Sequence, residues 1–231
     1  MLDTNFWKKY FKVYDVLNLF IPYQELLKTI CDELDIKKGD KILEAGCGTG
    51  NLALKIKERG ADVIGLDYSK EALEIYRQKD KDANLVLADL RNKLPFPDNF
   101  FDKIACNNTL YAIEKEKQVY TLKEFYRVLK PGGKIVLVNP KKGASPFKIY
   151  SGHIKISLKT KGIIKTFGDV TSMIIPTIKM FYFNYKIKKE RGRFFLNIQE
   201  QESVIRDIGF STIETKLVYG LQGILTQADK I

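Results

Sequence analysis

The stretch 41–50, KILEAGCGTG, decides the fold of this 231-residue chain. Residues 41–45 are a largely apolar run that predicts a buried strand, and Gly46, Gly48 and Gly50 follow it directly. The apolar spacing after the glycines predicts a helix. Glycines at such a junction let the backbone turn tightly and approach a ligand, and the helix N-terminus favours negative charge. The stretch therefore predicts an α/β fold with a ligand-binding turn after its first strand.

The rest of the chain continues this alternation of strands and helices. Further strands are predicted at 61–67, 84–88, 101–107 and 134–138, and helices at 70–78, 114–129 and 199–208. A Pro-Gly-Gly turn at 131–133 is expected to separate the helix at 114–129 from the strand at 134–138. Runs near 212–218 and 221–226 predict an antiparallel hairpin at the sheet edge. Because strands that alternate with helices pair mostly in parallel, we expect a sheet with helices on both faces.

The spacing of the glycines bears on the kind of ligand. A nicotinamide dinucleotide site has the pattern GxGxxG, with its last two glycines separated by two residues. Here Gly48 and Gly50 are separated by one residue, and Asn51 occupies the position where GxGxxG requires glycine. The turn is therefore not expected to bind a nicotinamide dinucleotide.

The turn and the segments after it resemble the class I S-adenosylmethionine-dependent methyltransferases, in which an acidic residue precedes GxGxG. The other pieces of that family's pattern follow in order: Asp67 in GLDYS, Asp89 in LADL, Asn107-Asn108, and RVLKPGGKIVLV at 127–138. Together they cover about residues 40–140. The resemblance implies a Rossmann-like fold, with a seven-stranded, mostly parallel sheet in the order 3-2-1-4-5-7-6 and an antiparallel terminal hairpin. It also implies S-adenosylmethionine as the cofactor.

The same resemblance implies a set of cofactor contacts. Asp67 is expected to accept hydrogen bonds from the ribose diol, and Asp89 to contact the adenine amino group. Asn107 is expected beside the methionine end of the cofactor. Tyr68 either packs against the adenine or is a simple surface aromatic. The expected contacts are Tyr14, Glu44, Gly46, Cys47, Gly48, Asp67, Tyr68, Asp89, Leu90 and Asn107.

Two residues at the turn have roles that the sequence leaves open or restricts. Glu44 either orients the turn backbone or reaches the cofactor's ammonium group; the alternative is a buried structural carboxylate that accepts backbone N–H bonds. Cys47 is expected to be a small side chain rather than a nucleophile, because no histidine is near it in sequence. His153 is the chain's only histidine, which excludes sites that need two, and no metal site is expected.

The chemistry of methyl transfer makes the catalytic residue hard to name from sequence. Transfer from a sulfonium is an in-line displacement, so the protein mainly aligns the reactants and excludes water. A base is needed only when the acceptor must lose a proton. Tyr14, Tyr111 and His153 are the candidates, and His153 is expected either at the surface or as a base on the substrate side.

The N-terminal segment gives a clue to the acceptor. WKKYFKVYD at 7–15 resembles the W-x-x-Y-x-x-x-Y-D signature of the ubiquinone/menaquinone-biosynthesis and lipid methyltransferase group. That resemblance implies that residues 1–35 form a helical lid, with Tyr10 and Tyr14 over cofactor and substrate. The alternative is an amphipathic capping helix whose Phe6, Tyr10 and Tyr14 belong to the core.

The net charge of +11 belongs to one segment. Residues 141–193 hold 13 Lys and Arg against two acids, a net of +11, while the remaining 26 basic and 26 acidic residues cancel. A helix is expected to start at Ser145-Pro146. After Asp169, large apolar residues recur at helical spacing, interrupted at Pro176: Val170, Met173, Ile174, Ile178, Phe181 and Tyr185. We expect this basic insertion to form a substrate lid or a membrane-facing subdomain.

These observations predict one methyltransferase domain over residues 1–231. Its expected acceptor is small and lipophilic or membrane-associated, either a quinone precursor or a lipid head group. RNA and soluble-metabolite methyltransferases are the alternatives, and a noncatalytic S-adenosylmethionine-binding regulator is a third; nucleic acid is the less favoured partner because aliphatic residues accompany the lysines. Neither a signal peptide nor an apolar run of about 18 residues is present, so we expect a cytoplasmic protein, free or peripheral at the inner membrane face.

Overall fold

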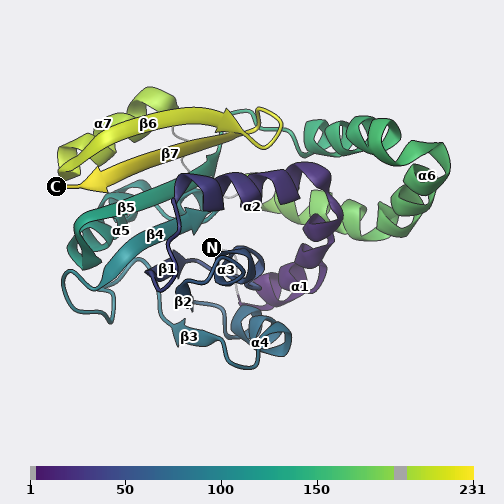
Figure 1. Cartoon of the computed structure of the whole chain (residues 1–231). Helices are drawn as coiled ribbons and strands as arrows, with labels where there is room; N and C mark the ends of the chain where they lie inside the picture. The colour runs from purple at the N-terminus through teal and green to yellow at the C-terminus, as the bar shows by residue number, and fades with distance from the viewer. Residues whose placement is uncertain (1–3, 190–196) are drawn as a thin grey trace.

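A seven-stranded sheet in the order β3-β2-β1-β4-β5-β7-β6 forms the centre of the computed structural model, which describes residues 4–189 and 197–231 (Figure 1). The strands are β1 Lys41–Ala45, β2 Asp62–Asp67, β3 Asn84–Leu87, β4 Phe101–Asn107, β5 Leu129–Pro140, β6 Phe210–Val218 and β7 Gly223–Lys230. Only β7 runs antiparallel to its neighbours, β5 and β6. The predicted Rossmann-like order and the terminal hairpin are therefore confirmed, with β7 inside the sheet and β6 at its edge.

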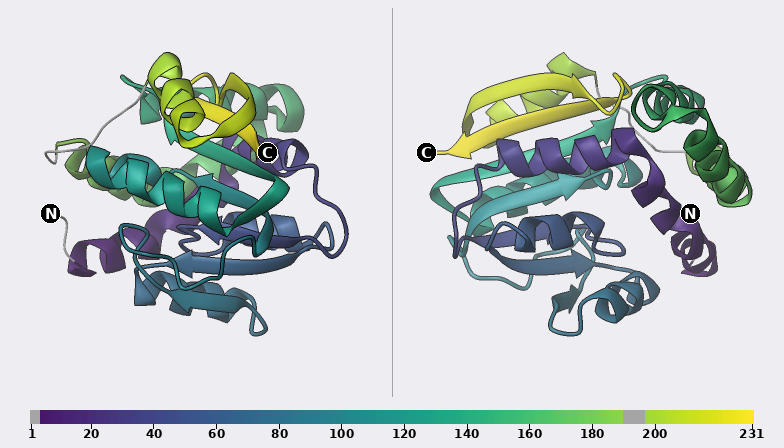
Figure 2. Two further views of the ribbon diagram at one scale, coloured as in Figure 1. Left: turned by 90° about the vertical axis from the view of Figure 1, so that its left-hand side faces the viewer. Right: turned by 45° about the vertical axis from the view of Figure 1, so that its right-hand side comes forward.

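Helices cover both faces of this sheet, as Figure 2 shows. Their bounds are α1 Thr4–Tyr14, α2 Ile21–Glu33, α3 Asn51–Lys57, α4 Lys70–Lys79, α5 Lys115–Val128, α6 Pro146–Lys189 and α7 Ile198–Ile208, with 3₁₀ turns η1 Asp15–Leu19 and η2 Leu110–Ala112. Ile42 packs into one hydrophobic core and Leu43 into the other, although they are neighbours on β1. Successive side chains of a strand point to opposite faces, which is why a strand buried on both sides is apolar throughout.

The turn predicted at 131–133 does not interrupt the fifth strand. Leu129 already pairs with Phe101, and the register then shifts so that Lys134 pairs with Lys103. The Pro-Gly-Gly residues form an irregularity inside β5 rather than a loop before it. The prediction of a turn before the strand was wrong, because β5 already pairs with β4 before these residues and pairs with it again after them.

The basic insertion folds as a long helix with a sharp kink. α6 begins at Pro146, where a helix start was predicted, and Gly162 (φ 79°, ψ 175°) divides it into a first arm, 146–161, and a second arm, 163–189. Pro176 lies inside the second arm without ending it. Both arms extend away from the sheet and meet at the far end of the molecule from β6 and β7 (Figure 1). Residues 190–193 of the predicted insertion lie outside the described residues.

The second arm buries only part of its apolar residues against the rest of the fold. Ile174, Ile178 and Tyr185 are exposed, whereas the buried apolar residues are Met173, Met180, Phe183 and Ile187. α6 packs against α1, α2 and η1, and these contacts decide which side is buried. Apolar residues thus lie on more than one side of this arm, and the predicted series at helical spacing contains both buried and exposed members. In the described parts of the chain, no helix has the length and apolar character that a bilayer crossing requires.

Candidate active site

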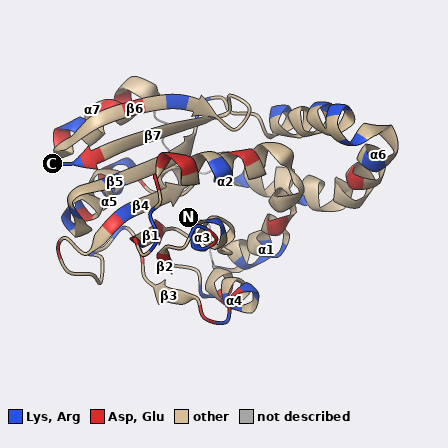
Figure 3. Ribbon diagram, in the orientation of Figure 1, with Lys and Arg blue, Asp and Glu red and all other residues tan. Residues whose placement is uncertain are grey.

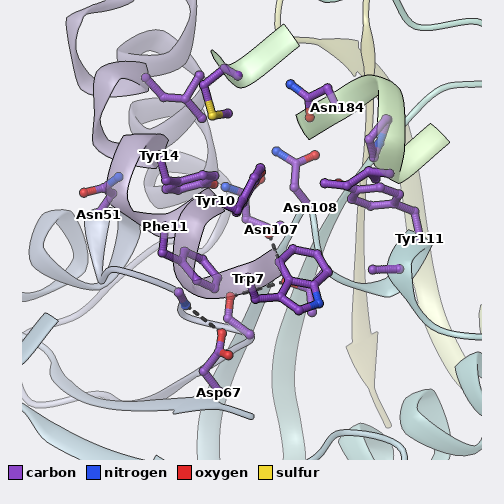
Figure 4. A pocket seen from close by; sticks show the side chains of 18 of the residues that line it. Trp7, Tyr10, Phe11, Tyr14, Asn51, Asp67, Asn107, Asn108, Tyr111 and Asn184 are labelled. Carbon is purple, nitrogen blue, oxygen red and sulfur yellow. Dashed lines mark hydrogen bonds between the residues drawn. The ribbon is translucent and has the colours of Figure 1, made fainter. Parts of the chain in front are cut away.

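A cavity of about 490 Å³ lies where the carboxyl ends of β1, β2 and β4 meet the N-terminal helices and the second arm of α6. Figure 4 shows Trp7, Tyr10, Phe11 and Tyr14 of α1 lying between Asp67 on one side and Asn184 of α6 on the other. The wall includes all ten residues predicted to contact a cofactor: Tyr14, Glu44, Gly46, Cys47, Gly48, Asp67, Tyr68, Asp89, Leu90 and Asn107. The structure brings them together around one space, and their contact with a cofactor stays a prediction.

The glycine turn and Asp67 hold each other in place. The backbone N–H of Gly48 donates to Asp67 Oδ2 at 2.8 Å, and that of Ser69 donates to Oδ1 at 2.9 Å. Gly46 has φ +77°, and a Cβ atom there would lie 2.3 Å from the side chain of Thr109. Burial raises the pKa of the Asp67 carboxyl, while these backbone N–H bonds oppose the rise. Asp67 is therefore fixed against the turn at the edge of the cavity, with acceptor lone pairs left over.

Three buried oxygen atoms among the lining residues have no hydrogen-bond partner in the described structure: Glu44 Oε2, Asn107 Oδ1 and Thr177 Oγ1. Burial raises the pKa of Glu44 well above its ordinary value; a backbone hydrogen bond from Ala53 opposes this, and the nearby charge of Asp67 adds to it. Buried acceptors without donors are costly, so a ligand with N–H or O–H groups fits this place. The ammonium group of S-adenosylmethionine is such a donor. Glu44 therefore shows features of both predicted roles, a backbone contact and a free oxygen.

Asp89 has a partner that the sequence reasoning missed. Arg91 Nε lies 3.0 and 2.9 Å from its two carboxylate oxygens, and Arg91 Nη2 lies 2.6 Å from Oδ2. Burial raises the pKa of Asp89, but the hydrogen bonds and charge of Arg91 outweigh this and hold it below the ordinary value. Asp89 is thus ionised and oriented. Beside it, Tyr68 is 47% exposed and meets Trp7 edge-on, so it is both a lining residue and partly at the surface.

The N-terminal segment is fastened to the glycine turn through Asp15, another residue that the predictions missed. Its Oδ1 accepts hydrogen bonds from Thr49 Oγ1 at 2.7 Å and from Asn51 Nδ2 at 3.1 Å. Its Oδ2 lies 2.7 Å from Lys79 Nζ. Phe11 packs where a side chain on Gly48 would point, 3.3 Å from that Cβ position. The only sequence signal for this clamp was the final aspartate of W-x-x-Y-x-x-x-Y-D.

Four tyrosines line the cavity: Tyr14, Tyr23, Tyr111 and Tyr219. A side-chain hydrogen bond joins Tyr14 to Tyr23, and Tyr23 also hydrogen-bonds to the side chain of Asn51 and is near the charge of Glu44. Burial raises the pKa of Tyr14 well above its ordinary value, and the nearby tyrosines add to the rise. Its hydroxyl therefore stays protonated at neutral pH and can donate or accept a hydrogen bond, which is unfavourable for a general base.

His153 corrects an expectation, because it is fully buried instead of lying at the surface. Its Nδ1 accepts a hydrogen bond from the backbone N–H of Ile21 at 3.2 Å, at the start of α2. It is absent from the cavity wall, and its ring packs on Phe20, which does line the cavity, with 5.3 Å between ring centroids. The first arm of α6 uses this histidine to satisfy a free N–H at a helix start. The geometry thus favours a structural role over that of a base.

Cys47 lies in the turn with a thiol poorly suited to attack a substrate. Burial raises the pKa of this thiol well above its ordinary value, and the charges of Glu44 and Asp67 add to the rise. A thiol that stays protonated is a weak nucleophile. The geometry agrees with the expectation of a small side chain that packs inside the turn.

Known proteins share both the sequence pattern and the fold. A family model described as a methyltransferase domain matches residues 43–137. A demethylmenaquinone methyltransferase of Geobacillus sp. (strain WCH70) is 31% identical over 224 residues, which are 91% of this chain and 88% of that protein. One from Staphylococcus saprophyticus is 34% identical over 219 residues, 90% of this chain and 87% of that protein.

Two solved structures share the fold at lower identity. A SAM-dependent methyltransferase from Aquifex aeolicus aligns with a TM-score of 0.61 at 18% identity, over all of both chains. Phosphoethanolamine N-methyltransferase 2 of Haemonchus contortus, in complex with S-adenosyl-L-methionine, aligns with a TM-score of 0.67 at 17% identity, over 95% of this chain and 56% of that one. With two relatives above 30% identity over most of their length, this chain belongs to the class I S-adenosylmethionine-dependent methyltransferases, and it is an enzyme that uses S-adenosylmethionine as its cofactor.

Proposed function

We propose that this enzyme methylates a ring carbon of a lipophilic quinone precursor, taken up as its quinol. The observation that carries the proposal is one continuous cavity with two unlike ends. The end at Asp67 and Glu44 is polar and contains unsatisfied acceptors. The rest of the wall includes Tyr14, Tyr111 and, from α6, Met180 and Phe181. The relatives named demethylmenaquinone methyltransferase support an aromatic, lipophilic acceptor over the predicted alternative of a lipid head group.

The polar end suits the cofactor. We assign the ribose hydroxyls to Asp67, whose carboxylate is already oriented by two backbone N–H groups. Tyr68 and Leu90 would hold the adenine, and Asp89 would accept a hydrogen bond from its amino group. Glu44 and Asn107, whose free oxygens are acceptors, would bind the ammonium group at the methionine end. Gly46, Gly48 and Cys47 form the floor of this part of the cavity.

The aromatic end suits a flat ring with oxygen substituents. Tyr14 and Tyr111 line it, and we propose that their hydroxyls hydrogen-bond to the quinol oxygens and fix the ring against the cofactor. The bound cofactor supplies a methyl group already activated by its sulfonium. The ring carbon forms the new bond as the sulfur–methyl bond breaks, and the ring then loses its proton to solvent, leaving the methylated quinol and S-adenosylhomocysteine. The protein's part is alignment and exclusion of water.

Two segments of the chain are expected to cover this site. Residues 1–35 act as the N-terminal lid, since α1 and η1 are fastened to the glycine turn through Asp15. The insertion 141–193 acts as the substrate lid, and its second arm supplies Thr177, Phe181 and Asn184 to the cavity wall. We further propose that the basic charge of this insertion brings the enzyme to an anionic membrane surface, where a lipophilic acceptor resides.

The test is methyl transfer to competing acceptor pools. The purified enzyme is incubated with S-adenosylmethionine labelled in its methyl group and with a demethylated naphthoquinol, a phospholipid extract, total RNA or a mixture of soluble metabolites. We expect label in the quinol alone. Label in RNA or in a soluble metabolite, with none in the quinol, would contradict the proposal and favour one of those alternatives.

A further inference from the structure

The bend of α6 exposes large apolar side chains at the tip of the molecule. We call residues 158–168 the elbow. Four of its side chains are exposed: Leu158 by 43%, Ile163 by 77%, Ile164 by 88% and Phe167 by 70%. Gly162, whose φ of +79° makes the bend possible, sits among them with open space where a Cβ would stand. Such a group at the tip of a helical projection is unusual for a surface that meets only water.

The inner side of the elbow is polar, which reverses the usual arrangement. Ser157 and Thr166 are buried between the two arms, and their hydroxyls lie 3.0 Å apart. Thr166 Oγ1 also donates to the backbone oxygen of Gly162 at 2.7 Å. The hydroxyls thus hold the bend together from inside while isoleucine and phenylalanine point outward. Exposure of these apolar side chains to water is unfavourable, whereas their transfer into an apolar medium is favourable.

Lysines accompany the exposed apolar group in the sequence. Residues 155–169 hold Lys155, Lys159, Lys161 and Lys165 against one acid, Asp169, a net of +3. All four lysines are exposed, and Lys161 pairs with Asp169 at 2.7 Å. Basic residues recur along both arms of α6, and Figure 3 shows those of the first arm and of the bend. An exposed apolar tip that carries exposed lysines next to it in the sequence is complementary to a bilayer surface, where anionic head groups cover an acyl interior.

We propose that the elbow inserts into the near leaflet of an anionic lipid bilayer, to the depth of the first acyl carbons. Ile163, Ile164 and Phe167 then lie among the acyl chains and the lysines at the head groups. This rests on the proposed function, since it names the element through which the enzyme meets the membrane that holds its acceptor. The second arm runs from the elbow to the cavity wall at Thr177, about 21 Å along a helix. Insertion therefore fixes one wall of the site relative to the bilayer.

The test compares binding of the full chain to vesicles. The elbow variant carries Ile163→Ser, Ile164→Ser and Phe167→Ser. The matched control carries Leu87→Ser, Leu217→Ser and Leu221→Ser, three exposed apolar residues outside α6. Co-sedimentation is measured with vesicles of phosphatidylcholine mixed with phosphatidylglycerol, and with pure phosphatidylcholine. We expect the elbow variant to lose about tenfold or more of its partitioning into mixed vesicles, and the control to match the unmodified enzyme.

Activity separates failure of this inference from failure of the proposed function. With a short-chain, water-soluble quinol the elbow variant should keep the unmodified rate, whereas with a long-chain quinol embedded in mixed vesicles its rate should fall. Equal partitioning of the two variants, or binding to RNA in place of vesicles, would overturn the membrane role of the elbow even if both quinols are methylated. Absence of methylation of either quinol by the unmodified enzyme, with vesicle binding intact, would overturn the proposed function alone.

Discussion

Asp67 joins the glycine turn to the proposed ribose site, so its loss should lower both cofactor affinity and stability. Asp67→Ala removes the acceptor for the ribose and leaves the buried N–H groups of Gly48 and Ser69 without a partner. We expect cofactor affinity to fall by tenfold or more, measured by calorimetry, with a lower melting temperature. Asp67→Asn keeps one acceptor oxygen and should lose less of both. Unchanged affinity in Asp67→Ala would remove Asp67 from the cofactor site.

Asp15 acts on the site from a distance by holding η1 to the turn. Asp15→Ala breaks contacts with Thr49, Asn51 and Lys79, and should lower the free energy of unfolding by about 1–3 kcal/mol. It should also weaken cofactor binding, because α1 then covers Gly48 less firmly. The control is Glu58→Ala, which removes an exposed ion pair with Lys55 and should change neither quantity measurably. Equal effects of the two variants would argue against the clamp.

The buried side chain of His153 should make the free energy of unfolding depend on pH. Burial lowers its pKa, with Lys161 adding to the effect and Asp169 opposing it. The unfolded chain therefore takes up a proton at this residue below a pH of about 6.5, where the folded chain resists it. Stability from His153 is full above that pH and is lost as the pH falls toward the lower folded pKa. Protonation also removes the lone pair that accepts from Ile21.

The measurement is urea unfolding of the unmodified enzyme and of His153→Gln across this range. A glutamine oxygen can accept from Ile21 but does not titrate. The difference in unfolding free energy between the two proteins should shift in favour of His153→Gln as the pH is lowered, while buried carboxyl groups such as Glu44 cancel in the comparison. A difference that is constant with pH would contradict the buried, neutral histidine.

At the scale of elements, the bend of α6 depends on Gly162, whereas Gly168 has no part in it. Gly162 has φ +79°, which side chains with a Cβ rarely adopt, so Gly162→Ala should destabilise the helix by about 1 kcal/mol. Gly168 lies within the second arm at ordinary helical angles with open space around it, so Gly168→Ala should stabilise by about 0.5–1 kcal/mol. Thermal unfolding followed by circular dichroism compares the two. Effects of the same sign would contradict the kink.

The elements differ in how far their sequence determines their place. The strands around the glycine turn could be predicted because a sheet covered on both faces demands apolar residues along each strand. The buried face of α6 could not, since apolar residues lie on both of its sides and only contact with α1, α2 and η1 selects one. The arrangement at the elbow, with hydroxyls inside and isoleucines outside, likewise depends on the path of the backbone at Gly162.

The whole molecule divides into a neutral catalytic fold and a basic projection. The sequence located this charge in 141–193, and the structure places its described part on a helical hairpin that extends from the sheet and supplies one wall of the cavity (Figure 3). The ten residues predicted to contact a cofactor line one cavity, and most of them stand in family motifs that occur in a fixed order along the chain; their contact with a cofactor stays a prediction. Asp15 escaped prediction because its partners Thr49 and Asn51 are 34 and 36 residues away, and the aspartate of the N-terminal signature does not by itself indicate which residues it contacts.

The central claim is that a methyl group moves from S-adenosylmethionine to a ring carbon of a quinol in this cavity. Mass spectrometry and NMR of the product formed with cofactor carrying a deuterated methyl group test it most directly. We predict one deuterated methyl group on a ring carbon for each S-adenosylhomocysteine released. Label on an oxygen of the quinol, or S-adenosylhomocysteine formed without any labelled quinol, would contradict it.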